Sequence, residues 1–352
     1  MTCRKMGGLQ QSLVPYALAL KSRGHTVQIV ARRGADILDE VRQRGLEDDT
    51  CLLGGGWRLL WRLQTRALRR KLLEFAPDIV VGFAQKGFFE AARAMRGLDV
   101  PVVTRVGTMQ PKRQRRFVKA DGWLATTEEM QRSLTGLGFP APRVFIVPNF
   151  LADPVAPETG ADHADHACVP LIGSMARFVR RKGLHVLIEA VALLQHRGVR
   201  IRCDIAGGGR VRAELARQIE ALDAGDSVRL VGWLAGERKT EFLAGLELFV
   251  CPSLDEPFGF VYLEAMRMGK PVITAPTVGA RHIFSDGDGA VFVPFSDPAA
   301  MADAIEALVG DAPRRASLGA RATEIYRERF SLDAGARNLG DALVALRAAG
   351  RR

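Results

Sequence analysis

Short runs of almost uninterrupted apolar residues recur through the first 150 residues. They predict strands at 26–31, 77–84, 100–107, 122–127 and 143–149. Runs without polar alternation are typical of strands that are buried on both faces of a parallel sheet. Apolar residues at helical spacing predict helices between these strands, at 8–23, 86–96 and 128–137. The alternation of strands and helices indicates a doubly wound α/β domain.

The second half of the chain repeats this alternation. The predicted strands lie at 170–178, 201–209, 228–233, 246–253, 271–280 and 289–295, and the predicted helices include 210–224, 297–310, 313–329 and 332–348. Between the halves, residues 151–169 lack periodicity and are rich in Pro, Ala and Asp. Such composition marks a linker. We therefore expect two α/β domains, at 1–152 and 170–331, joined by a linker at 153–169.

Composition supports a globular chain of two domains. A length of 352 residues is too great for one ordinary core. An apolar content of 47% and a charged content of 25% are those of globular proteins and exclude a disordered chain. The apolar runs are too short to predict a transmembrane helix, and residues 1–8 do not resemble a secretory signal.

The cysteines and histidines predict neither a disulfide framework nor a metal site. The five cysteines are scattered without a C-x-x-C pair, which favours a reduced cytoplasmic setting. The linker contains a small cluster of potential ligands, His163, Asp165, His166 and Cys168. Their spacing fits no standard zinc pattern, and the composition of the linker explains them better. We therefore expect no bound metal.

Positive charge is concentrated in the first half of the chain. Residues 1–150 contain 25 Lys and Arg against 13 Asp and Glu, whereas the whole chain has a net charge of +11. Such asymmetry suggests an anionic partner. Anionic membrane lipid, a phosphorylated acceptor and nucleic acid all have this charge.

The most cationic predicted helix covers residues 57–75. Trp57, Leu60, Trp61, Leu68 and Leu72 lie broadly on one side, and Arg58, Arg62, Arg66, Arg69 and Arg70 cover much of the other. Trp and Arg on an amphipathic helix suggest contact with a membrane interface. The alternative is an ordinary helix that packs on the sheet with a solvated basic face.

Two carboxylates with seven residues between them stand out between Pro252 and Pro271. The breakers Pro257 and Gly259 place Glu256 in a loop, whereas Glu264 falls about one turn into a helix over 260–268. The first turn of such a helix offers free N–H groups and a favourable dipole to a phosphate. Carboxylates on either side could bind hydroxyl groups. This arrangement suits a nucleotide sugar.

The stretch from Glu256 resembles the E-x7-E signature of the retaining family 4, or group 1 type, glycosyltransferases. The matching residues are E-P-F-G-F-V-Y-L-E-A-M-R-M-G-K-P-V-I. The resemblance implies that Glu256 contacts the donor sugar and Glu264 the ribose hydroxyls. It also assigns Pro257, Phe258 and Gly259, which lie between the two carboxylates, to the donor site. The alternative for each Glu alone is an ordinary loop or surface charge.

A second set of residues resembles the diphosphate site of this family. Arg177 lies at the end of the predicted strand at 170–178, and Lys182 stands before a glycine and a long helix. A guanidinium and an ammonium at such a turn can neutralise a leaving diphosphate. The Gly207-Gly208 turn is where the family approaches the nucleotide. It is not a dinucleotide fingerprint, because Arg212 replaces the third glycine.

The resemblance is weaker in the first half. Gly7-Gly8 corresponds to a loop that approaches the donor phosphates and the acceptor; the alternative is simple flexibility near a terminus. A strand usually precedes this loop, but here only residues 1–6 do. Either this strand is missing or the start has been assigned too late, and we expect a truncated start. Arg105 stands where the family commonly has a His, and it either lines the cleft or pairs with a carboxylate.

The resemblance implies a GT-B fold, in which two Rossmann-like doubly wound domains with parallel sheets face each other across a cleft. It also implies that the final helix, within 332–352, crosses back to the first domain. The implied reaction is retaining transfer of a hexose from a UDP- or GDP-sugar to a glycan or lipid-linked acceptor. Lys182, Arg177 and Glu256 would be catalytic, and no metal or other cofactor is required.

We expect this reaction to serve lipopolysaccharide or cell-surface glycan synthesis, in the cytoplasm or on the inner face of the cytoplasmic membrane. One alternative is a GT-B nucleotide-sugar epimerase or a catalytically silent relative. A nucleic-acid-binding protein is a further alternative, because the isoelectric point is about 9.9. Aromatic residues make up only 7% of the chain, so nucleic acid is not the expected partner.

Overall fold

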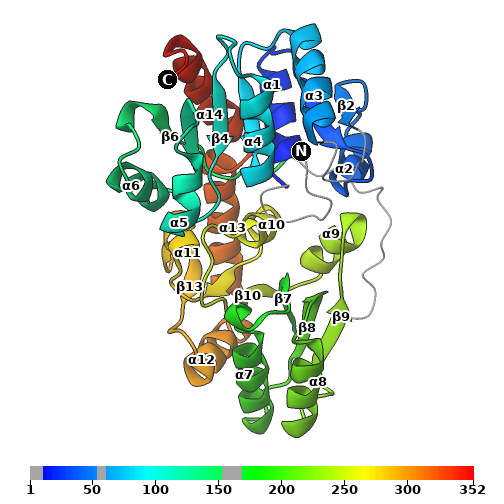
Figure 1. Cartoon of the computed structure of the whole chain (residues 1–352). Helices are drawn as coiled ribbons and strands as arrows, with labels where there is room; N and C mark the ends of the chain where they lie inside the picture. Colours follow the sequence, from blue (N-terminus) through cyan, green and yellow to red (C-terminus); the bar gives the residue numbers. More distant parts are fainter. Residues whose placement is uncertain (1–10, 54–60, 153–168) are drawn as a thin grey trace. The chain divides into compact units, whose positions relative to one another are not determined.

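A computed structural model describes residues 11–53, 61–152 and 169–352 (Figure 1). The chain divides into two compact units. Unit 1 consists of Met1–Asp153 and Arg329–Arg352, and unit 2 of Pro154–Glu328. The Gly7-Gly8 loop, the cluster at 163–168 and any strand before Gly7 lie outside the described residues.

The strands of unit 1 form two parallel sheets within the described residues, rather than the single sheet expected. The first sheet pairs β1 (Ile29–Arg32) with β2 (Thr50–Leu53). The second has the order β3-β4-β5-β6, with bounds Val80–Phe83, Val102–Arg105, Gly122–Ala125 and Val144–Ile146. The short β2 is an addition to the predicted strands.

The helices of unit 1 include two partners that are distant in sequence. α1 (Leu13–Ser22) packs against α14 (Leu332–Ala348), and both contribute to one hydrophobic core with Phe83 and Phe150. The C-terminal helix is thus part of unit 1. The other helices are α2 (Ile37–Gln43), α3 (Trp61–Phe75), α4 (Ala84–Ala94), α5 (Pro111–Gln114) and α6 (Glu128–Gly136), with 3-10 turns at Arg115–Phe117 and Ala141–Arg143.

Part of α3, the helix expected to contact a membrane, packs into the hydrophobic core of unit 1. Leu68 and Leu72 of α3 are buried in a cluster with residues of α4. Arg69 donates to the carbonyl oxygens of Ala94 and Arg96, at 2.7 and 2.9 Å. Arg66 and Arg70 are the exposed part of the described basic face. This portion of α3 therefore packs as an ordinary helix, and its exposed side chains include Leu73 as well as the two arginines.

Unit 2 contains one continuous parallel sheet of seven strands. The order is β12-β13-β11-β10-β7-β8-β9. The bounds are Ser285–Asp286, Gly289–Phe292, Val272–Thr274, Leu248–Cys251, Leu171–Arg177, Arg202–Gly208 and Val228–Gly232. The chain runs outward from β7 through β8 to β9, and then returns to place β10 on the other side of β7. The strand order therefore reverses between β7 and β10, where ligands of such sheets bind.

The helices of unit 2 cover this sheet. They are α7 (Leu184–His196), α8 (Arg212–Ala221), α9 (Gly236–Ala244), α10 (Phe260–Arg267), α11 (Val278–Ile283), α12 (Pro298–Val309) and α13 (Ala312–Arg329), with a 3-10 turn at Arg180–Lys182. α7 packs against α12 over a core that includes Ile205 and Val250. The predicted α/β class is confirmed. No helix within the described residues has the length and apolar character needed to cross a membrane.

Candidate active site

The turn after β7 carries the two expected phosphate ligands. Arg177 is exposed at the end of the strand, whereas Lys182 is buried at the end of a 3-10 turn. The next residue, Gly183, has φ +66° and begins α7. A Cβ at Gly183 would lie 1.9 Å from the carbonyl oxygen of Pro252. Glycine therefore lets this turn lie directly against the loop after β10.

The end of β8 lies beside Arg177. In the register of the two strands, Ala176 is opposite Gly207 and Arg177 is opposite Gly208. The N–H of Phe178 donates to the carbonyl oxygen of Gly208 at 2.8 Å. The Gly207-Gly208 turn and Arg177 thus occupy one edge of the sheet.

An ion pair joins the turn after β7 to the loop after β10. The Nζ atom of Lys182 donates to Oε2 of Glu256. Both side chains are about one-tenth exposed, at 11% and 12%. A second link fixes the loop, because the N–H of Gly279 in α11 donates to the carbonyl oxygen of Glu256 at 2.8 Å. Two sequence-predicted residues that are far apart in the chain therefore meet.

The loop from Glu256 enters α10 through Gly259, as expected. Phe258 is buried, and its ring centroid lies 5.7 Å from that of His282 and 6.4 Å from that of Phe260. Gly259 is the N-cap residue, so no side chain caps α10. Pro257 is half-buried between Glu256 and this aromatic group. The free N–H groups of the first turn of α10 are therefore available to an anion.

The buried Glu264 forms a second ion pair, with a residue that the sequence analysis did not single out. The Nζ atom of Lys239 in α9 donates to Oε1 of Glu264 at 2.7 Å. The side chain of Glu264 is 6% exposed and that of Lys239 is 25% exposed. A buried carboxylate needs a cation or several donors. No local pattern in the sequence indicates Lys239 as this partner, because it lies on another helix, 25 residues earlier in the chain.

The buried hydroxyl of Tyr262 and the buried thiol of Cys251 contribute to packing beneath the site. The hydroxyl of Tyr262 lies 2.9 Å from Oγ1 of Thr274. Burial raises the pKa of Tyr262 and that of Cys251 above their usual values. Neither group therefore ionises near neutral pH. Among the residues the structure describes, no cluster of His, Cys, Asp and Glu could hold a metal ion.

Arg105 lies in unit 1, at the end of β4, and is buried. It donates to Oδ1 of Asn149, which lies 3.5 Å from the hydroxyl of Ser12. Of the two alternatives for Arg105, a carboxylate partner is not what is observed among the described residues, where Arg105 bonds to the amide oxygen of Asn149 and interacts with Tyr16. Burial lowers the pKa of Arg105 and raises that of the neighbouring Tyr16 to about 12.

Each half of the chain matches a glycosyltransferase family model. Residues 6–152 match the family model described as Glycosyltransferase Family 4, and residues 163–325 match Glycosyl transferases group 1. The chain is 29% identical over 346 residues to the lipopolysaccharide core biosynthesis glycosyltransferase LpsE of Rhizobium meliloti (strain 1021). This match covers 94% of each chain. The chain is 28% identical over 337 residues to LpsD of the same organism, covering 92% of this chain and 91% of LpsD.

A similar solved structure is that of Anabaena HepE in complex with UDP and glucose. The TM-score is 0.81 at 19% identity, and the match covers 98% of each chain. The predicted GT-B fold is thereby confirmed.

Gly207 and Gly208 form a matched pair that tests how the site is built. At Gly207, φ is +139° and a Cβ would lie 1.9 Å from the carbonyl oxygen of Ala176, whereas a Cβ at Gly208 would meet nothing within 4 Å. We expect Gly207→Ala to lower the free energy of unfolding by at least about 2 kcal/mol. Gly208→Ala should change it by less than about 0.5 kcal/mol. Urea titration measures both, and equal losses would contradict this account.

Proposed function

Because residues 6–152 and 163–325 form glycosyltransferase domains, we propose that the protein transfers a hexose from a nucleotide-diphosphate sugar to a glycan or lipid-linked acceptor. The observation that carries the proposal is the pair of carboxylates with their lysines, the partly buried Glu256 with Lys182 and the buried Glu264 with Lys239. They flank the first turn of α10. The relatives named for lipopolysaccharide core biosynthesis support an acceptor of that class.

The geometry suits a nucleoside diphosphate in three ways. Lys182 and Arg177 supply positive charge at the ends of β7 and its turn. The uncapped turn of α10 supplies backbone donors. Glu264, one turn into α10, can accept hydrogen bonds from ribose hydroxyls. HepE was solved with UDP and also with UDP-glucose, which favours a UDP-sugar over a GDP-sugar here.

Glu256 and Lys182 have linked roles in this proposal. An ammonium group has three donors, so Lys182 can keep its bond to Glu256 while it donates to a diphosphate oxygen. Glu256 would then hold the hydroxyls of the sugar and keep Lys182 in place. Charge that develops on the leaving diphosphate would be stabilised by groups already oriented before the reaction.

We propose that transfer retains the anomeric configuration of the sugar. The acceptor attacks the anomeric carbon on the same face from which the diphosphate departs. The bond between the anomeric carbon and the diphosphate oxygen breaks, and the acceptor oxygen bonds to that carbon. The acceptor proton passes to the leaving diphosphate. No metal takes part in this scheme, because Lys182, Arg177 and α10 neutralise the charge. Proton NMR of the product decides the point, since an inverted anomer would refute it.

The first expected result is stabilisation by one class of nucleotide. Ligand at about 100 times its Kd adds about 2.7 kcal/mol to stability, which a thermal-shift screen of UDP, GDP, ADP and their sugars detects. We expect UDP to raise the Tm, and Glu264→Gln to remove most of the shift. Glu220→Gln, at an exposed position of α8, is the control. A shift that survives in Glu264→Gln undiminished would exclude the assigned ribose site.

Turnover should depend on Lys182 and not on its neighbour. Lys182→Ala removes a charge that stabilises the leaving diphosphate, so we expect kcat to fall by about 10² to 10³. Arg181→Ala is the matched control, since Arg181 is exposed and pairs with Asp255 on the surface. The measurement is nucleotide release in the presence of acceptor glycan. If Lys182→Ala keeps more than a tenth of the activity, charge neutralisation is not its role.

We also propose a peripheral contact with anionic lipid on the inner face of the cytoplasmic membrane, supported by Arg66 and Arg70 of α3. Each arginine near such a surface contributes about 1 kcal/mol, so Arg66→Gln with Arg70→Gln should weaken vesicle binding about 30-fold. Sedimentation with phosphatidylglycerol vesicles at low salt measures this. Arg210→Gln with Arg212→Gln, at exposed positions in unit 2, is the control. No sedimentation of the unaltered chain would refute the contact.

A further inference from the structure

Unit 1 carries a dense run of positive charge shortly after β4. Residues 111–119, the basic segment, contain five cations in nine positions: Lys112, Arg113, Arg115, Arg116 and Lys119. All five side chains are exposed. No Asp or Glu occurs between residues 100 and 120, and none of the five cations forms an ion pair with a described residue. Their charge is therefore available to a partner from outside the chain.

Buried anchors hold the basic segment in place. The buried Gln114 donates from Nε2 to the carbonyl oxygen of Thr108 at 3.0 Å, and its Oε1 accepts from the hydroxyl of Ser133 at 2.8 Å. Phe117 is also buried, and its carbonyl oxygen accepts from Nε1 of Trp123 at 2.9 Å. Residues three apart in a helical turn share one face. The cations therefore project from an ordered backbone.

The basic segment reaches the edge of the sheet where ligands bind. β4 ends at Arg105, six residues before the segment begins. Nη1 of Arg116 donates to Oε1 of Gln85 at 3.0 Å, and Gln85 is the second residue of α4, which begins directly after β3. Lys86, the next residue of α4, is a further exposed cation. Ligands of parallel sheets bind beyond the carboxyl ends of the strands, so these cations are well placed for one.

Arg105 adds buried positive charge at this edge. It is 2% exposed, and within the described residues its Nε and Nη1 atoms lack a hydrogen-bond partner. A buried charge is costly unless it is paired. Charges also act more strongly where water is excluded. An anion bound beyond β4 would therefore be attracted to Arg105 as well as to the basic segment.

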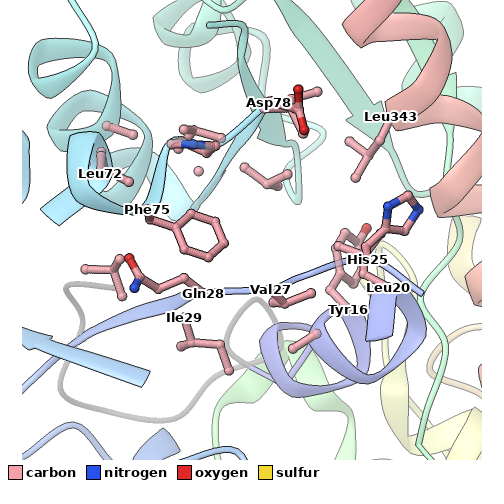
Figure 2. Close-up of a pocket in the computed structure, with 18 of the residues that line it drawn as sticks. Tyr16, Leu20, His25, Val27, Gln28, Ile29, Leu72, Phe75, Asp78 and Leu343 are labelled. Carbon is pink, nitrogen blue, oxygen red and sulfur yellow. The ribbon is translucent and has the colours of Figure 1, made fainter. Parts of the chain in front are cut away.

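The large groove of unit 1 is a poorer site for an anion. It has a volume of about 970 Å³, and Figure 2 shows apolar side chains along it, among them Leu20, Val27 and Phe75. Arg347 is the one Lys or Arg among the described residues that line it, and it already pairs with Asp78 at 3.3 Å. The unbalanced charge of unit 1 therefore lies on the basic segment and not in the groove.

The exposed side chains of the basic segment select among anionic partners. Binding of single-stranded nucleic acid uses aromatic rings for stacking, whereas Phe117, the one aromatic residue of the segment, is buried. Insertion into a membrane interface needs a broad apolar face, but Val118 is the one large apolar side chain exposed here. A phosphate monoester carries a charge of about −1.5 to −2 at pH 7 and three acceptor oxygens. Clustered Arg and Lys bind such a group through charge-assisted hydrogen bonds.

We propose that the basic segment binds phosphate groups of the acceptor, which is therefore a phosphorylated glycan. This inference rests on the proposed function and names the chemical class of its acceptor. The phosphate groups lie against Lys112, Arg113 and Arg116, which are exposed and free of carboxylate partners among the described residues. They take no part in the transfer itself. They determine which glycan is held and in which orientation its hydroxyl groups are presented.

The test measures the binding of one oligosaccharide in two forms. Pentamannose phosphate carries a phosphate monoester, and phosphatase treatment yields the same oligosaccharide without charge. We expect calorimetry at low salt to show that the unaltered chain binds the phosphorylated form at least about tenfold more tightly. Lys112→Gln with Arg113→Gln and Arg116→Gln should raise its Kd about tenfold, because three exposed ion pairs of ordinary strength correspond to about that factor. Absence of binding to the phosphorylated form would overturn the proposal.

A second triple variant controls for net charge. Arg200→Gln with Arg217→Gln and Arg314→Gln removes three exposed arginines of unit 2 and should leave the Kd unchanged. Equal losses in the two triple variants would mean general attraction and overturn the proposal. Equal binding of tetragalacturonic acid would mean that any acidic glycan suffices, and would overturn it too. The same holds if the basic segment supports binding to phosphatidylglycerol vesicles but not to the phosphorylated glycan.

The thermal shift with UDP, measured on the same samples, separates this inference from the proposed function. A shift with UDP but no binding of the phosphorylated glycan overturns the inference alone. Binding that depends on the basic segment, without a shift from any nucleotide, supports the phosphate site and contradicts the proposed function. An equal UDP shift in both triple variants shows that they are folded.

Discussion

The ion pair between Lys182 and Glu256 fixes the relation between the two strand ends that form the site of unit 2. Lys182 follows β7 and Glu256 follows β10, on either side of the point where the strand order reverses. A buried ion pair adds little net stability, but removing one partner would leave the other as an uncompensated charge inside the protein. The pair therefore holds the turn after β7 and the loop after β10 in a fixed relative position. Gly183 makes the approach possible, because any side chain there would collide with Pro252.

The second ion pair fixes the position of α10 relative to α9, through a carboxylate one turn into α10. Glu264 is nearly inaccessible, and Lys239 reaches it from α9. Both carboxylates thus have their charge balanced before a ligand arrives. A nucleotide sugar would bring hydroxyl groups to the carboxylates and phosphate charge to Lys182 and the end of α10. Little rearrangement is then needed on binding, which reduces its entropic cost.

Local sequence signals predicted where the two carboxylates lie in the secondary structure. Pro257, Gly259 and the helix formers after them placed Glu256 in a loop and Glu264 in a helix, since these preferences act over a few residues. Lys239 was not predicted, because its contact with Glu264 joins distant parts of the chain. β2 is only four residues long and falls below the length at which an apolar run is distinctive. The division of the unit 1 sheet depends on strand pairing, which is likewise non-local.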